Sequence, residues 1–91
     1  MNITLIALLL LAPQDPVALS DKAQEFAQQH RFDEAEKLWR HALTLSPAFF
    51  PALFNLGYMK STQGKHAEAA PLLEQAARAN PRDFNTRNLL G

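Results

Sequence analysis

The chain has 91 residues, of which 47% are hydrophobic, and this is enough for one small domain with a compact core. Its net charge is near zero because nine basic residues balance nine acidic ones, so nothing draws it over long range to nucleic acid or to an anionic membrane. No cysteine occurs, which excludes a disulfide framework and cysteine-ligated zinc, and three glycines are too few for a phosphate-binding loop. The aliphatic residues are mostly Leu and Ala, which favours helices over strands.

Residues 1–15 form an apolar leader. Met1 to Gln14 carry no charged side chain, and Ile3 to Ala12 is apolar except for Thr4. As a helix these ten residues would span about 15 Å, half of a hydrocarbon core of about 30 Å. They are therefore too short for an ordinary transmembrane helix and suit the apolar region of a signal peptide. The leader predicts export, to the periplasm or another extracytoplasmic compartment.

Two features weaken the signal-peptide interpretation and keep alternatives open. No Lys or Arg precedes the apolar run, and Pro13 follows it in place of a clean A-x-A cleavage site. The leader could instead be an apolar helix packed on the domain of a cytoplasmic protein, or a membrane anchor that lacks part of its span. In either alternative, the leader could contact a membrane transiently.

An internal repeat begins directly after the leader. Shifting the sequence by 34 residues aligns 42 residue pairs from Pro16 onward, and eleven of these pairs are identical. Nine of the eleven identities fall on small, apolar or Pro positions, such as Ala35 with Ala69 and Pro47 with Pro81. Structure constrains the residue type at such positions, so the period indicates a repeat fold.

Each repeat unit predicts two helices. Asp15 followed by Pro16 is a favourable helix start, and Leu19, Ala23 and Phe26 share one face of the first helix. A second apolar stripe at helical spacing consists of Ala35, Leu38, Trp39 and Ala42, and Ser46-Pro47 ends it. The second unit repeats the plan with Leu53, Leu56 and Gly57, then Gly64 at the turn, then Ala69, Leu72, Leu73 and Ala76, and Asn80-Pro81 at its end.

These residues resemble the tetratricopeptide repeat family. The match is carried by Leu19, Ala23, Phe26, Phe32, Ala35, Trp39, Ala42 and Pro47 in the first unit, and by Leu53, Leu56, Gly57, Gly64, Ala69, Leu73, Ala76 and Pro81 in the second. The resemblance implies an all-α solenoid of antiparallel helix–turn–helix repeats, with repeat one at residues 16–49, repeat two at 50–83 and the start of a truncated third at 84–91. Because so short a third helix is marginal, we expect the chain to be incomplete.

Three residues depart from the family pattern. Lys22 stands where a Leu is usual, His30 replaces the turn glycine, and Lys60 stands where an aromatic residue is usual. We expect Lys60 to lay its aliphatic stem on the core and to keep its ammonium group in water.

The resemblance also implies a concave groove, lined by the first helix of each unit, in which a partner segment binds. The family's groove positions also fall on Val17, Ala27 and Ser61 in this chain. The residues predicted to contact a partner are Ser20, Gln24, Gln28, Phe54, Asn55, Tyr58 and Thr62. None is charged, so capture of an acidic tail by basic residues is not expected. Phe54 and Tyr58 stand four apart and predict an exposed contact site, unless both pack against neighbouring helices.

No residue pattern predicts a catalytic, cofactor or metal site. The three histidines, His30, His41 and His66, lack the i, i+4 spacing of a helical metal site and are expected at the surface. The acidic residues Asp33, Glu34, Glu36 and Glu68 are expected to be solvated charges near helix starts, and Trp39 to be a core residue.

The sequence thus predicts a non-enzymatic scaffold or adaptor that binds a protein or peptide, with no nucleic acid and no small-molecule substrate. One alternative is that the chain is the N-terminal repeat portion of a larger enzyme or assembly factor whose active domain lies beyond Gly91. Self-association is another. In an uncleaved chain, the leader is expected to lie across or beside the first helices and to hide part of the groove.

Overall fold

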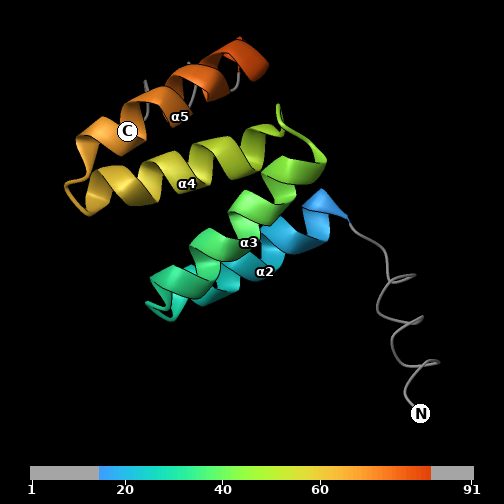
Figure 1. Cartoon of the computed structure of the whole chain (residues 1–91), viewed down its shortest axis with the longest axis vertical. Helices are drawn as coiled ribbons and strands as arrows, with labels where there is room; N and C mark the ends of the chain where they lie inside the picture. Colours follow the sequence, from blue (N-terminus) through green and yellow to red (C-terminus); the bar gives the residue numbers. More distant parts are fainter. Residues whose placement is uncertain (1–14, 83–91) are drawn as a thin grey trace.

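The computed structural model describes residues 15–82, whose helices form two antiparallel hairpins (Figure 1). In chain order the helices are α2 (Pro16–Gln28), α3 (Phe32–Leu45), α4 (Phe50–Thr62) and α5 (His66–Ala79). α2 packs along α3 and α4 packs along α5, while α4 joins the hairpins by packing on α3 and, more lightly, on α2. The predicted all-α repeat fold is confirmed. Residues 1–14 of the leader lie outside the described residues, and so does its predicted docking beside the first helices. The predicted third unit lies outside them as well.

The helix ends follow local sequence signals. Asp15 caps α2, because its Oδ1 accepts a hydrogen bond of 2.9 Å from the backbone N–H of Val17. α3 and α5 end directly before Ser46 and Asn80, since the proline that follows each of these residues disfavours their helical conformation. None of the helices within residues 15–82 is long and apolar enough to cross a membrane.

The turns inside the two hairpins differ in how easily they adopt their backbone conformation. His30, between α2 and α3, has φ 62°, and Gly64, between α4 and α5, has φ 77°. Glycine adopts this left-handed conformation freely, whereas a residue with a Cβ atom pays roughly 1–2 kcal/mol. The His30 ring gains an edge-on contact with Phe32 at 5.6 Å between ring centroids, which offsets part of that cost.

Small residues let the helices approach closely around a few large ones. Ala23 and Ala42 have no exposed surface, and Trp39 is only 2% exposed, so its predicted place in the core is confirmed. A Cβ atom added at Gly57 would lie 2.8 Å from Cδ2 of Leu73, closer than normal van der Waals contact. The glycine therefore sets the distance between α4 and α5.

The prediction that the Lys60 ammonium stays in water is wrong. Lys60 is 4% exposed, and its Nζ pairs with Glu36 of α3 at 2.9 Å and with Glu68 of α5 at 3.1 Å. Glu36 also accepts a hydrogen bond of 2.8 Å from Arg40 and keeps 24% of its side chain exposed, so the expected solvated charge is partly covered. The cause is position: at the junction of the hairpins the lysine stem has no direct path to solvent, and two carboxylates meet its ammonium there.

This ion-pair network stays charged over a wide pH range. The hydrogen bond to Glu36 raises the pKa of Lys60, although burial alone would lower it. Burial would raise the pKa of Glu36, but the hydrogen bonds from Lys60 and Arg40 outweigh burial and lower it. The network thus links α3, α4 and α5 through charges that persist at neutral pH.

Candidate functional site

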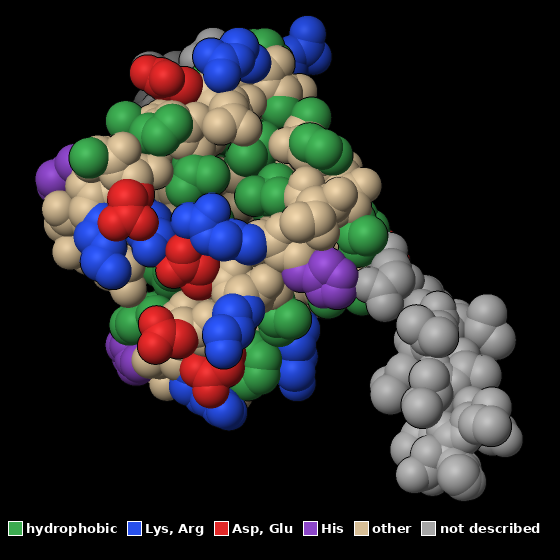
Figure 2. All heavy atoms as spheres, in the orientation of Figure 1, with side chains coloured by type: hydrophobic (Ala, Val, Ile, Leu, Met, Phe, Trp, Pro, Cys, Tyr) green, Lys and Arg blue, Asp and Glu red, His purple; other side chains and the backbone are tan. Residues whose placement is uncertain are grey.

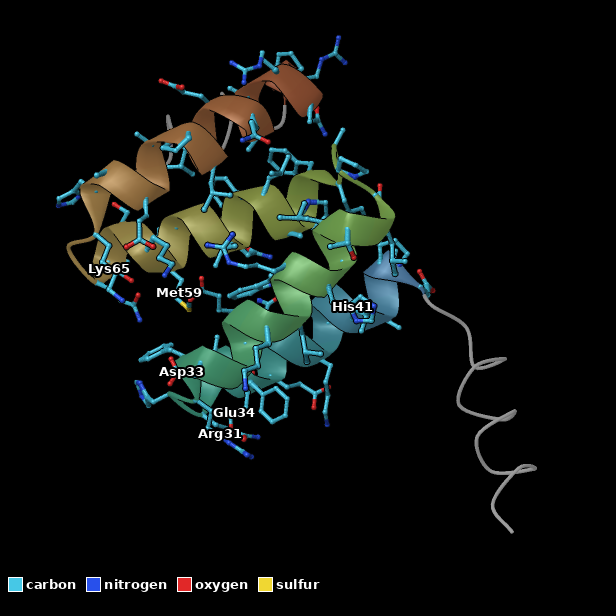
Figure 3. All side chains as sticks on the ribbon, in the orientation of Figure 1. Arg31, Asp33, Glu34, His41, Met59 and Lys65 are labelled. Atoms are coloured by element: carbon cyan, nitrogen blue, oxygen red, sulfur yellow. The ribbon has the colours of Figure 1, made fainter. Side chains whose placement is uncertain are left out.

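A hollow of about 240 Å³ lies between α2 and α4, the first helices of the two hairpins. α2 lines it with Gln24, Ala27 and Gln28, and α3 contributes Phe32 and Trp39. α4 lines the opposite side with Asn55, Tyr58, Met59 and Thr62. In Figure 3 the Met59 side chain points from α4 toward the first hairpin. We call these nine residues the α2–α4 groove.

The chemistry of the groove is apolar with neutral polar groups. Phe32, Trp39 and Met59 form an apolar wall of ring and thioether atoms, although Trp39 and Met59 are only 2% and 5% exposed, and none of the nine lining residues carries a charge. The side-chain amides of Gln24, Gln28 and Asn55 each provide a donor and an acceptor. A groove of this kind can bury an apolar side chain and bind neutral polar groups beside it.

Tyr58 is the most exposed of the large hydrophobic side chains in the groove, with an exposed fraction of 61%. Its ring stacks on Phe54 at 6.2 Å between centroids, and Phe54 stacks on Phe50 at 5.6 Å. Phe54 itself is partly buried against the core. The two rings therefore differ in role: Phe54 packs against the core and supports Tyr58, whereas Tyr58 faces solvent.

Of the seven predicted groove residues, the structure brings together Gln24, Gln28, Asn55, Tyr58 and Thr62. Ser20 and Phe54 do not line the hollow. Ser20 is 4% exposed, so its predicted place on an accessible surface is wrong. The family spacing puts Ser20 on the groove side of α2, but packing covers a side chain as short as this.

Sequence reasoning missed Phe32, Trp39 and Met59 as groove residues. Trp39 was assigned to the core alone, yet it also forms part of the groove wall. Its indole Nε1 is buried and has no hydrogen-bond acceptor within residues 15–82. Met59 stands four residues after Asn55, a spacing that places both on one helix face, whereas the contribution of α3 depends on the angle between the hairpins.

The surface outside the groove carries charges of both signs. Figure 2 shows basic and acidic side chains interspersed on the viewed face, with no field of a single sign there. Arg31 and Glu34 pair at 2.8 Å at the turn between α2 and α3, where Figure 3 shows them close together. This hydrogen bond lowers the pKa of the exposed Glu34. Within residues 15–82 no group of three or more His, Asp or Glu residues could hold a metal ion.

These features define a helical-repeat protein with a neutral groove. Comparison with protein families gives a match to the tetratricopeptide repeat model over residues 20–84, and again over 60–91. The chain therefore belongs to the tetratricopeptide repeat family. Repeats of this family generally mediate protein–protein interaction, and the family is typically a non-catalytic interaction module. No curated protein matches the chain.

Proposed function

We propose that this protein is a scaffold or adaptor that binds a segment of a partner protein in the α2–α4 groove. The observation that carries the proposal is the exposed Tyr58 beside an open apolar hollow on the first-helix side of both hairpins. A large exposed aromatic side chain next to a hollow is typical of a contact site rather than of an ordinary surface. The absence of charge from the groove lining favours apolar and neutral contacts over electrostatic capture.

A peptide-display selection on the immobilised protein tests the proposal. Peptides enriched on the wild-type chain should lose about tenfold or more in affinity with Tyr58→Ser, because an aromatic side chain at an interface commonly carries over 1 kcal/mol of binding. His41→Ser is the matched control, since His41 is an exposed ring on α3 that does not line the groove. Isothermal titration calorimetry measures both. No enrichment, or equal loss in the two variants, would contradict the proposal.

The alternative of a larger enzyme or assembly factor is a proposal about sequence beyond Gly91. Reading the gene downstream of the codon for Gly91 decides it. A continuous reading frame that encodes a domain with a catalytic motif would support this alternative, and it would make the groove a docking module within that protein.

A further inference from the structure

We propose that the α2–α4 groove takes an uncharged peptide segment in extended conformation, anchored by one large apolar side chain. The inference rests on the proposed function and specifies the chemistry of the partner. Four features of the groove carry it, namely the size of the hollow, the neutral hydrogen-bonding groups on its two sides, the buried indole donor of Trp39, and the missing charge.

The size of the hollow defines the anchor. In proteins generally, an apolar cavity of about 150 Å³ holds a benzene molecule. The hollow of about 240 Å³ therefore has room for one aromatic or leucine side chain. Phe32, Trp39 and Met59 form apolar wall around it. Because burying such a side chain removes a large apolar surface from water, the anchor supplies a large share of the affinity.

The polar groups define the conformation of the segment. Gln24 and Gln28 on α2 face Asn55 on α4 across the hollow, and each amide can both donate and accept a hydrogen bond. A helical partner has already paired its backbone groups, whereas an extended segment presents free N–H and C=O groups to such amides.

Trp39 gives an independent reason to expect a carbonyl group. Its indole Nε1–H is buried without an acceptor within the described part of the chain, and a buried unsatisfied donor is costly. A backbone carbonyl of the segment that enters beside the indole, with a small shift of the groove wall, would satisfy this donor. An extended segment supplies such carbonyls along its whole length, whereas a helix leaves free only those of its last turn.

The missing charge defines what the groove rejects. Since none of the nine lining residues is charged, a Glu or Lys side chain of the segment would lose its hydration without gaining a partner. The groove therefore discriminates against charged segments by leaving their charges unpaired.

The experiment uses acetylated and amidated octapeptides with an uncharged Ser/Gln/Gly frame. One carries a central Phe, the second a central Ala, the third a central Phe with a Glu on each side, and the fourth the Phe peptide with its central amides N-methylated. Affinities come from titrations of the full chain, followed by the single indole cross-peak of Trp39 in ¹H–¹⁵N spectra.

The Phe peptide should bind and move the indole proton downfield, as expected when Nε1–H gains an acceptor. The other three peptides should each bind about tenfold more weakly. The Ala peptide loses the anchor, the Glu peptide must desolvate its charges, and the N-methylated peptide loses the hydrogen bonds that its backbone N–H groups donate. Gln28→Leu should weaken binding of the Phe peptide, whereas Gln29→Leu, an exposed neighbour outside the hollow, should not. Circular dichroism checks that both variants fold, and the N-methylated peptide tests the hydrogen bonds that the backbone N–H groups of the segment donate, without any variant of the protein.

Equal affinity of the Glu or Ala peptide, or full affinity of the N-methylated one, overturns the inference. If display peptides bind the groove but the Phe peptide does not, the inference fails and the proposed function stands. If neither binds, both fail. A rise of more than about tenfold in affinity for the Phe peptide when Leu9 and Leu10 are replaced by Arg would identify the leader of this chain as the occupant, and would overturn the assignment to a partner.

Discussion

The Lys60 side chain shows how one residue can connect two repeats. It lies at the position where the family has an aromatic residue, and its stem occupies core space while its ammonium pairs with Glu36 and Glu68. Its packing and its charge contribute separately to stability, and two substitutions distinguish them.

Lys60→Ala removes both contributions and should lower the free energy of unfolding by about 2–3 kcal/mol. Lys60→Met keeps the apolar stem, and because Glu36 retains Arg40 and Glu68 is exposed, it should stay within about 1 kcal/mol of wild type. Urea denaturation followed by circular dichroism measures both values. Equal losses in the two variants would mean that charge, rather than packing, governs this position.

The network also sets how stability depends on pH. The pKa of Glu36 is lowered in the folded chain, so its contribution is present above the ordinary value of 4.5 and is lost as pH falls through the folded pKa. The pKa of Lys60 is raised, so its contribution is present below 10.5 and is lost as pH rises through the folded pKa. Stability from the network should therefore be flat between about pH 5 and pH 10. Melting temperatures across pH should show smaller acid and alkaline losses in Lys60→Met than in wild type.

His30 is held in a conformation that favours glycine. His30→Gly should raise the free energy of unfolding by about 0.5–1 kcal/mol, because the relief of backbone strain exceeds the lost contact with Phe32. Gly64→Ala in the equivalent turn is the matched reverse change. The added Cβ atom would meet no atom within 4 Å, so the expected loss of stability comes from the φ of 77° alone. Urea denaturation decides, and a His30→Gly variant less stable than wild type would show that the ring contact outweighs the strain.

At the scale of the helix, local signals and packing have separate effects. α5 runs from His66 to Ala79 through Pro71, which lies early in the helix and removes one backbone donor. The helix persists because Ala69, Leu72 and Ala76 bury their side chains where α5 packs along α4. Tertiary packing thus outweighs an unfavourable residue within a helix.

Trp39 is the largest side chain that α3 contributes to the packing of the hairpins. Trp39→Ala should cost about 3–5 kcal/mol, the usual range for truncation of a buried large aromatic residue. Two repeats have little more stability than this, so we expect loss of helical circular dichroism at 25 °C. Lys37→Ala on the exposed side of α3 is the control and should melt within a degree or two of wild type. Retention of the helical signal by Trp39→Ala would show that the hairpins are stable without this contact.

At the scale of the whole molecule, we propose that the leader directs export. Replacing Leu9 and Leu10 by Arg would interrupt the apolar run from Ile3 to Ala12, so the full-length precursor should remain in the cytoplasm. The wild-type chain should appear outside the cytoplasm in a shortened form. Mass spectrometry of the N-terminus measures this, and an intact Met1 on a cytoplasmic wild-type chain would refute export.

The sequence by itself determined the helices, their turns and the repeat, because these depend on neighbours along the chain. Asp15 as a cap, and Ser46 and Asn80 before proline, acted locally, as expected. Most of the groove was also predictable, since side chains on one face of a helix keep the family spacing.

Only the tertiary structure decided which of these side chains reach solvent. The junction of the hairpins buries the ammonium of Lys60, and packing around α2 covers Ser20. The arrangement of the two hairpins also places Trp39 of α3 in the wall of a groove formed mainly by α2 and α4. The physical reason is that exposure depends on the distance and angle between hairpins, and helical periodicity within one segment carries no information about either.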